Sequence, residues 1–305
     1  MRAIVVDDSA PGRVRLADVP EPVAAPHEAL VRVSAVSVNP GDLGEIDRAP
    51  AGLVVGWEAA GVVEREAADG SGPARGTRVT TFSASGGWAE LRAAPTEWLA
   101  PVPDGVELTD AATLPVSAGS ALRAVREVGP VLGRRLLVTG ATGAVGAHAV
   151  QLGALAGAEV VAVTRDPGQA GRLRRLGATE VVDRPSAATS RVDGVIDNVG
   201  GDVLVDAFGM LHDNGVLVSV GRAARRDAVL GPDLLLGEWG RTRRDIRTFL
   251  LLHADRRLDR DLAVLAGWVA DGRLRTSVGR VEDLAGGVEL IAVREWTGKL
   301  VLRVS

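Results

Sequence analysis

The sequence contains no cysteine and no tyrosine, and each absence removes a class of chemistry. Without cysteine the chain can form no disulfide, has no thiolate nucleophile and offers no thiolate ligand to zinc. Without tyrosine it has no phenol to act as a proton donor. The four histidines form no metal-ligand spacing with one another: His27, His148, His212 and His253. The sequence therefore predicts no bound metal.

Long hydrophobic runs are also missing. No apolar stretch approaches the roughly 20 residues that span a bilayer, and the net charge of −4 argues against a general nucleic-acid binder. The opening residues MRAIVV have the pattern of a strand rather than of a signal peptide. We therefore expect a cytoplasmic protein whose partner is a small-molecule substrate, and neither a nucleic acid nor a membrane.

The most informative stretch runs from 135 to 166 and reads RLLVTGATGAVGAHAVQLGALAGAEVVAVTRD. An apolar strand at 136–138 precedes a glycine turn, a small-residue helix and a second apolar strand at 160–163. In this context the glycines let the backbone approach a diphosphate, which the amides at the helix start would bind. The sequence thus predicts dinucleotide contacts from Gly140, Thr142, Gly143, Ala144, Val145 and Gly146. A tight strand–helix–strand unit without a ligand is the alternative.

The end of the second strand bears on which dinucleotide binds. NAD sites usually carry an acidic residue there for the ribose hydroxyls. This chain has Thr164 and Arg165 instead, and a guanidinium suits the 2′-phosphate of NADP. A charge-assisted contact of roughly 1.5–3 kcal/mol would favour NADP by about ten- to a hundredfold. We therefore expect NADP(H), although Asp166 keeps NAD open and an ordinary surface charge is the other interpretation of Arg165.

Strands and helices continue to alternate after Asp166, which is typical of an α/β fold with a doubly wound parallel sheet of the Rossmann type. Strands are expected at 180–182, 194–197 and 215–220. Ligands of such sheets bind beyond the carboxyl ends of the strands. The residues at these ends therefore join the expected cofactor site: Asn198, Gly221 and Arg222.

The first hundred residues have short irregular strands separated by proline and glycine turns, which indicates a β-rich, partly closed barrel. A turn is expected at 37–42, and helices at 109–128 (divided by Pro115), 246–253 and 259–270. The tail, with a last strand at 299–304, is expected to return to the barrel. The predicted division is a substrate domain of residues 1–113 plus 272–305, and a dinucleotide-binding domain of residues 114–271.

Eight segments spread along the chain carry a family resemblance: MRAIVV (1–6), VNPGD (38–42), GWEAAGVV (56–63), AATLPVSAGSALRAV (111–125), VTGATGAVG (138–146), VIDNVGG (195–201), GVLVSVGR (215–222) and TGKLVLRV (297–304). Together they resemble the medium-chain dehydrogenase/reductase superfamily, and within it the zinc-free quinone oxidoreductase branch, the ζ-crystallin-like enzymes. The resemblance implies a GroES-like catalytic domain beside the Rossmann domain. It also implies a homodimer or homotetramer.

The departures from the family pattern concern the metal and the proton donor. Zinc members of the superfamily carry a ligand cysteine where this chain has Asn39, and a ligand histidine where it has Trp57. The resemblance therefore implies hydride delivery to an activated C=C bond, without a Lewis acid. Quinone-reductase relatives usually place a tyrosine soon after the VNPxD turn, which this chain lacks.

Five further residues are candidates for the site. The amide of Asn39 is the first candidate to donate to a substrate carbonyl oxygen. Ser120 is the second, because it stands where relatives have a hydroxyl near the nicotinamide. Asp42 would protonate the enolate if burial raised its pKa. Trp57 would form a wall for the substrate, and Phe249 resembles the segment that covers the nicotinamide. The alternative roles are turn formation for Asn39, a helix start for Ser120, hydrogen bonds that tie loops for Asp42 (with water as the proton donor), and core packing for Trp57 and Phe249.

Three functions remain open from the sequence. The first is an NADPH-dependent reductase that delivers hydride to an enone, enoyl ester or quinone. The second is a zinc-free alcohol or carbonyl dehydrogenase. The third is an NADPH-binding protein without enzymatic activity.

Overall fold

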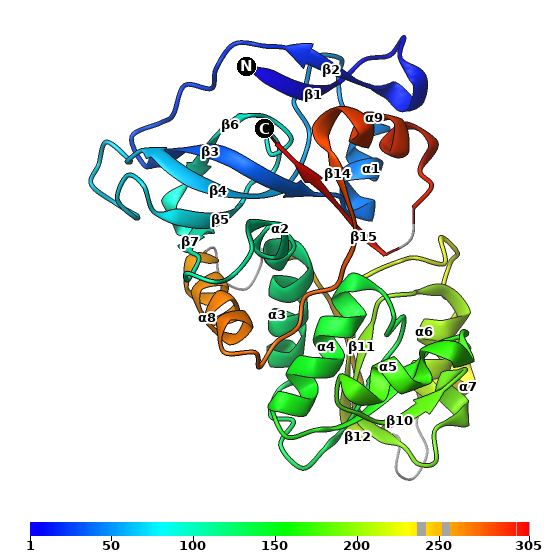
Figure 1. Cartoon of the computed structure of the whole chain (residues 1–305). Helices are drawn as coiled ribbons and strands as arrows, with labels where there is room; N and C mark the ends of the chain where they lie inside the picture. The colour runs from blue at the N-terminus through cyan, green and yellow to red at the C-terminus, as the bar shows by residue number, and fades with distance from the viewer. Residues whose placement is uncertain (237–241, 252–256, 297, 305) are drawn as a thin grey trace. The chain divides into compact units, whose positions relative to one another are not determined.

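The computed structural model describes residues 1–236, 242–251, 257–296 and 298–304. The chain forms two compact units (Figure 1): Met1–Gly119 with Asp255–Ser305, and Ser120–Ala254. The chain re-enters the first unit at 254/255, whereas the sequence placed this crossing at 271/272. The intervening helix α8 (Asp259–Ala270) packs against β7 (Leu99–Pro101), which accounts for the earlier crossing.

The first unit is built on a seven-stranded sheet with the order β14-β15-β3-β4-β5-β7, in which β6 also pairs with β3. All its pairs are antiparallel except the pair of β14 and β15. A separate antiparallel pair, β1 and β2, precedes it. The remaining strands are β1 (Arg2–Val6), β2 (Val14–Asp18), β3 (Glu28–Ser37), β4 (Glu58–Arg65), β5 (Arg78–Phe82), β6 (Leu91–Pro95), β14 (Val278–Asp283) and β15 (Lys299–Arg303).

The C-terminal strand β15 pairs with β3, so the tail returns to the first unit as the sequence predicted. The main core of this unit includes Ile4, Val36, Trp88 and Leu302, which are almost fully buried. Besides α8, the helices of the unit are α1 (Pro40–Ile46), α2 (Leu108–Ala111) and α9 (Leu284–Val293).

The second unit contains a six-stranded sheet with the order β10-β9-β8-β11-β12-β13, and every pair in it is parallel. This order is that of a doubly wound dinucleotide-binding fold, in which the direction of winding reverses between β8 and β11. The predicted α/β fold class is confirmed. The strands are β8 (Arg135–Val138), β9 (Glu159–Val163), β10 (Ala178–Val182), β11 (Val192–Asp197), β12 (Leu211–Ser219) and β13 (Asp245–Thr248).

The helices of this unit are α3 (Gly119–Val128), α4 (Ala144–Leu155), α5 (Ala170–Arg175), α6 (Gly201–Gly209) and α7 (Pro232–Leu236). Helix α4 is buried over eight consecutive residues from Gly146 to Gly153, because small side chains let it lie directly on the sheet. A Cβ atom added at Gly146 would lie 2.2 Å from the carbonyl oxygen of Gly140. Because residue 146 is glycine, the start of α4 can lie directly against the turn that precedes it.

Two local predictions were wrong. Residues 246–248 are strand rather than helix, because they pair in parallel with β12 and complete the sheet; positions 252 and 253 of that expected helix lie outside the described residues. Residues 40–42 begin a helix rather than a turn. Pro40 occupies its first position, and the Asp42 carboxylate accepts the backbone N–H of Asn39 at 2.7 Å.

The expected helix at 109–128 is interrupted. It consists of α2, a π-helical segment (Leu114–Ala118) that contains Pro115, and α3. Such π segments are often found at functional sites. Within the described ranges, no helix combines the length and the apolar character that crossing a bilayer requires.

We predict that Gly146→Ala lowers the free energy of unfolding by about 1–3 kcal/mol, since the added methyl group overlaps the Gly140 carbonyl oxygen and forces α4 away from its turn. Gly231→Ala is the control, because a Cβ there meets no atom within 4 Å. Urea denaturation of both variants measures the effect. Equal stabilities of the two variants would contradict the close contact.

Candidate functional site

In the second unit, the turn between β8 and α4 has the geometry of a phosphate cradle. Gly140 has φ +57°, in the left-handed region that favours glycine. Gly143 is exposed and stands immediately before the first residue of α4. The first amides of α4 have no partner earlier in the helix, and they point toward the turn with the positive end of the helix dipole. A diphosphate suits such a position.

A buried carboxylate holds this turn to the neighbouring strand end. Asp197, the last residue of β11, accepts the hydroxyl of Thr139 at 2.6 Å and the amide N–H of Gly200 at 2.9 Å. Asn198 in turn donates its side-chain amide to the Thr139 carbonyl oxygen at 2.9 Å. Burial raises the pKa of Asp197, while these donors favour its ionised form. The loops after β8 and β11 are therefore one hydrogen-bonded assembly.

The other residues predicted to bind the cofactor also follow strand ends. Thr164 and Arg165 come directly after β9, Asn198 after β11, Gly221 and Arg222 after β12, and Phe249 after β13. Because all six strands are parallel, these residues share the carboxyl edge of the sheet. Thr164 is buried, Arg165 and Arg222 are exposed, and Phe249 is half-buried. The structure gathers them at one edge, and their contact with a cofactor stays a prediction.

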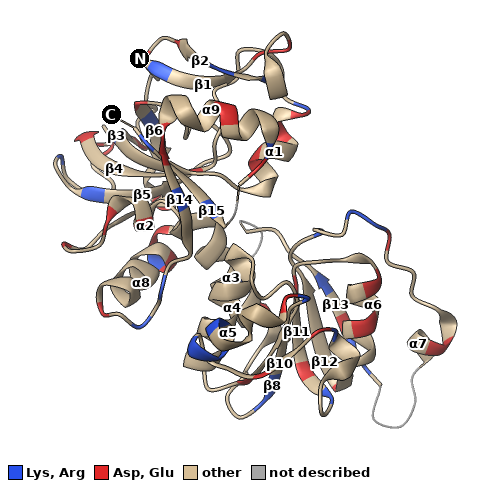
Figure 2. Cartoon of the chain, turned by 45° about the vertical axis from the view of Figure 1, so that its right-hand side comes forward, with Lys and Arg blue, Asp and Glu red and all other residues tan. Residues whose placement is uncertain are grey.

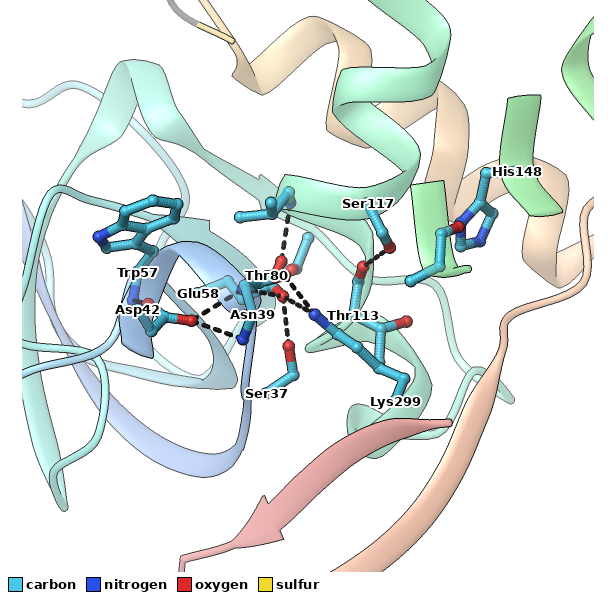
Figure 3. Close-up of polar contacts among 12 residues, drawn as sticks. Ser37, Asn39, Asp42, Trp57, Glu58, Thr80, Thr113, Ser117, His148 and Lys299 are labelled. Carbon is cyan, nitrogen blue, oxygen red and sulfur yellow. Dashed lines mark hydrogen bonds and ion pairs between the residues drawn. The ribbon is translucent and has the colours of Figure 1, made fainter. Parts of the chain in front are cut away.

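The first unit contains a buried polar cluster around Glu58 (Figure 3). The Glu58 carboxylate accepts the ammonium of Lys299 at 2.7 Å and the side-chain amide of Asn39 at 2.9 Å. It also accepts the hydroxyl of Ser37, and the backbone N–H of Val116 in the π-helical segment at 2.7 Å. Both side chains of the ion pair are nearly inaccessible, at 4% exposure for Lys299 and 0% for Glu58. Burial of these charges is tolerated because each is paired and hydrogen-bonded.

Asn39 joins the members of this cluster. Its side-chain N–H groups donate to Asp42 at 3.1 Å and to Glu58 at 2.9 Å, and its carbonyl oxygen accepts the ammonium of Lys299. An amide carries two N–H donors, and both are used within the cluster. The structure thus corrects the role predicted for Asn39, since no amide hydrogen remains for a substrate oxygen. Asn39 instead holds two carboxylates and one ammonium in place.

Asp42 is fully buried and accepts three N–H groups. Its oxygens bind the backbone and side-chain amides of Asn39 and the backbone N–H of Trp57, the last at 3.0 Å. Burial raises the pKa of Asp42 to about 7, and the nearby Glu58 charge adds to the rise, although the amides oppose it. The raised pKa fits the sequence prediction. Both oxygens face the protein, however, so Asp42 acts by fixing the backbone and not as a donor that touches a substrate.

Trp57 is held from several sides. Its backbone N–H binds Asp42, its indole N–H binds Glu45 at 2.8 Å, and its carbonyl oxygen accepts the guanidinium of Arg92 at 2.8 Å. The side chain is only half-buried, so a rigid indole surface remains accessible. This arrangement agrees with the wall expected at Trp57, and a substrate contact there stays a prediction.

Arg92 is a buried cation whose direct partners in the described part of the chain are neutral. Besides the Trp57 carbonyl it donates to the Thr81 hydroxyl at 3.0 Å, and its Nε has no partner. Burial lowers the pKa of Arg92 to about 9, which leaves the guanidinium charged at neutral pH. The charges of Asp42 and Glu58 lie close enough to stabilise it. Two cations and two carboxyl groups thus share the interior of this unit.

Ser120 lies in the second unit, at the second residue of α3, and is 6% exposed. It directly follows the last residue of the first unit, Gly119. Its predicted role toward a substrate oxygen stays a prediction.

The residues at the family's metal position do not fit a zinc ion. The chain has no cysteine, and the described residues contain no group of three or more potential ligands from histidine, aspartate and glutamate. The Asn39 oxygen is already bonded to an ammonium, and a second cation beside it would be repelled.

The sequence analysis did not identify Lys299 or Arg92. One signal for Lys299 was present in the composition, because it is the only lysine among the 35 lysine and arginine residues. A chain that uses arginine at every other basic position has here the compact ammonium, which donates to both Glu58 and Asn39. For Arg92 the sequence shows only an arginine within an apolar strand.

We predict that the stability of the unit falls as pH rises from about 4 to 7 because of Asp42. In this window the folded state retains a proton that the unfolded chain has released, since the pKa is raised from 3.8 to about 7. Asp42→Asn should remove this slope, which is at most about 1.4 kcal/mol per pH unit. Chemical denaturation at a series of pH values measures it. Asp7→Asn is the control, because the pKa of exposed Asp7 lies near 2, outside the window; parallel curves for wild type and Asp42→Asn would refute the assignment.

We predict that Lys299→Met destabilises the protein by about 3–5 kcal/mol, because it leaves the Glu58 carboxylate buried without a counter-ion. The double variant Lys299→Met/Glu58→Gln should recover part of this loss. Urea denaturation of the wild type, Lys299→Met, Glu58→Gln and the double variant gives the coupling energy. Arg15→Met, which breaks an exposed pair with Asp7, should cost less than about 1 kcal/mol. An additive result for the buried pair would contradict the coupling.

Comparison with known proteins agrees with this architecture. A family model described as the alcohol dehydrogenase GroES-like domain matches residues 25–104, and one described as zinc-binding dehydrogenase matches residues 176–302. The native structure of a mycobacterial quinone oxidoreductase superimposes with a TM-score of 0.87 at 26% identity, covering 100% of both chains. A mycobacterial structure in complex with NADPH gives 0.85, also at 26% identity and with full coverage.

Curated relatives include the quinone oxidoreductase-like protein 2 of Bos taurus, 28% identical over 93% of this chain and 86% of that protein. The acryloyl-coenzyme A reductase of Sulfurisphaera tokodaii is 24% identical over 99% of this chain and 100% of its own length. The erythronolide synthase EryA2 of Saccharopolyspora erythraea is 34% identical over 69% of this chain, which spans only 6% of that synthase. The chain belongs to the medium-chain dehydrogenase/reductase superfamily of oxidoreductases, in its quinone oxidoreductase branch.

Proposed function

We propose that this protein is an NADPH-dependent reductase that transfers hydride to an activated C=C bond, in an enone, enoyl ester or quinone, without a metal. The observation that carries the proposal is the glycine turn before α4, which presents free amides at the carboxyl edge of a parallel sheet. The name of the acryloyl-coenzyme A reductase and the NADPH bound in a mycobacterial neighbour support it.

The residues of the second unit would hold the cofactor in a fixed orientation. The amides from Ala144 to Gly146 would bind the diphosphate, while the Gly143 N–H closes the turn on the Gly140 carbonyl oxygen at 3.0 Å. Arg165 follows β9, which is the position where the adenine ribose lies in this fold. Its side chain is exposed and would pair with the 2′-phosphate. The site therefore favours NADP(H) over NAD(H).

When bound, the reduced nicotinamide supplies a hydride to the β-carbon of the acceptor, and a proton from water completes the reduction at the α-carbon. A double bond conjugated to a carbonyl accepts hydride at carbon, so a Lewis acid at the reacting atom is not required. The oxygen gains negative charge, and a hydroxyl that donates to it lowers the barrier. Ser120 remains the candidate for this role, since both amide hydrogens of Asn39 are used.

The buried cluster of the first unit would keep the substrate wall rigid. Asp42 binds the backbone N–H of Trp57, Arg92 binds its carbonyl oxygen, and Glu45 binds its indole N–H. A wall that does not reorganise positions a planar acceptor at low entropic cost. We further propose a cytoplasmic homo-oligomer that acts on a small molecule, as the family resemblance implies.

We predict that Arg165→Ala raises the KM for NADPH about ten- to a hundredfold and leaves the KM for NADH nearly unchanged, because only NADPH carries the 2′-phosphate. Cofactor oxidation with quinones, α,β-unsaturated ketones and saturated ketones as acceptors provides the assay. Arg134→Ala is the matched control, since that exposed arginine precedes β8 at the opposite edge of the sheet.

The same assay separates the alternatives. Turnover of saturated ketones but not of enones would replace the proposal by a carbonyl dehydrogenase. NADPH binding without turnover of any acceptor would indicate a binding protein. An equal rise of both KM values in Arg165→Ala would remove the argument for NADP.

A further inference from the structure

The loop that follows β12 reads GRAARRD from Gly221 to Asp227 and is anchored through its backbone. The N–H of Ala224 binds the Val199 carbonyl oxygen at 2.8 Å, and that of Gly221 binds the Asp197 carbonyl oxygen at 3.1 Å. A further bond of 3.0 Å from the N–H of Arg225 to the Arg222 carbonyl oxygen closes the loop on itself. The loop is thus fixed to the same strand end that Asp197 holds to the cofactor turn.

The side chains of this loop are not neutralised. Arg222, Arg225 and Arg226 are all exposed, and among the described residues none of them makes an ion pair or a side-chain hydrogen bond. Other exposed arginines of the chain do, such as Arg32 with Glu64 at 2.6 Å. The segment carries a net charge of +2, from three arginines and one aspartate. Arg225 has φ +51°, a conformation that L-residues seldom adopt.

The loop follows a different strand of the sheet from Arg165, which is the residue expected at the 2′-phosphate (Figure 2, in which β12 is labelled). Arg165 follows β9, whereas this loop follows β12, three strands further along the sheet. Neighbouring strands are about 4.8 Å apart, so the two positions are roughly 14 Å apart. In this fold the dinucleotide crosses the point where the winding reverses, with its adenosine half over β9. The nicotinamide half then lies toward β11 and β12, on the side where a hydride acceptor must bind.

We propose that Arg225 and Arg226 bind a phosphate on the arm that carries the acceptor. The substrate is then an α,β-unsaturated thioester of a phosphopantetheine arm, as in coenzyme A or on a carrier protein. This inference rests on the proposed function and narrows its substrate class. Guanidinium groups bind phosphate oxygens in pairs of parallel hydrogen bonds, and several on one rigid loop suit a multiply charged group. An uncharged quinone would need none of them.

The reaction on such a thioester is balanced by the cofactor alone. The hydride of NADPH forms a C–H bond at the β-carbon while the C=C π bond breaks, and a proton from water adds at the α-carbon. The thioester is not cleaved. The acceptor gains two electrons and NADPH becomes NADP⁺, so no further reductant is needed.

The test compares three crotonyl thioesters that share one reacting group: those of pantetheine, 4′-phosphopantetheine and coenzyme A. Each is reduced by the wild type and by Arg225→Ala/Arg226→Ala at low ionic strength. The expected result is a rise of about tenfold or more in KM for the phosphate-bearing thioesters, with kcat and the KM for NADPH unchanged. The pantetheine thioester should be reduced equally by both proteins. Arg174→Ala/Arg175→Ala is the control, because these exposed residues lie at the far end of α5.

The pattern of effects identifies the phosphate. A rise in the KM of the double variant for both phosphate-bearing thioesters points to the 4′-phosphate, which coenzyme A and carrier proteins share. A rise in KM for the coenzyme A thioester alone points to its 3′-phospho-ADP group and excludes a carrier protein. No difference between the three thioesters in either protein overturns the proposal and leaves the loop as a solvated surface.

Binding is measured separately, so that the proposal does not depend on turnover. Calorimetry of coenzyme A with the NADP⁺-loaded wild type and double variant should show a loss of about tenfold or more in affinity in the variant. Equal affinities overturn the phosphate site. Turnover of no activated C=C compound at all would instead overturn the proposed function, while the calorimetric result would still decide on the site.

Discussion

The first unit depends on one buried carboxylate. Glu58 accepts hydrogen bonds from three segments that are distant in the chain: residues 37–39 at the junction of β3 and α1, the π-helical segment and β15. A carboxylate inside a protein is costly unless its lone pairs are filled, so these three segments must come together for the charge to be tolerated. The position of Asn39, and through it of Asp42 and Trp57, follows from this requirement.

The second unit also depends on a buried carboxylate that accepts hydrogen bonds from separate segments, namely that of Asp197. Asp197 closes β11 and holds the turn after β8 through the Thr139 hydroxyl. The backbone of the arginine-bearing loop binds the carbonyl oxygen of the same aspartate. Three loops that would meet a ligand are thereby ordered before any ligand binds. Such preorganisation lowers the entropy lost on binding, because the loops need not be fixed at that moment.

The elements that could be predicted are those whose signals are local. The glycine turn at 140–146 and the strands that flank it are recognisable because their spacing reflects mechanical needs of adjacent residues. The strand at 245–248 was mistaken for a helix, since its four residues are exposed and owe their conformation to pairing with β12. A strand conformation that depends on pairing with another strand gives little signal in the sequence of the segment itself.

The site was predicted less completely than the fold. The residues of the cofactor edge were found because parallel strands place their ends together. Asn39 and Asp42 were singled out, but their roles depend on Lys299, which bonds Asn39 across 260 residues of sequence. A contact at such separation has no local pattern. The only clue was compositional, namely a single lysine in a chain otherwise rich in arginine.

That composition has a consequence for the chemistry of the whole chain. Apart from its amino terminus, the folded protein offers amine-directed reagents one target, and this target is sealed in the interior at 4% exposure. Acylation or reductive alkylation of Lys299 therefore requires the sheet around Glu58 to open. The rate at which Lys299 is modified therefore reports how often the first unit opens transiently. Mass spectrometry can measure this rate without any engineered label.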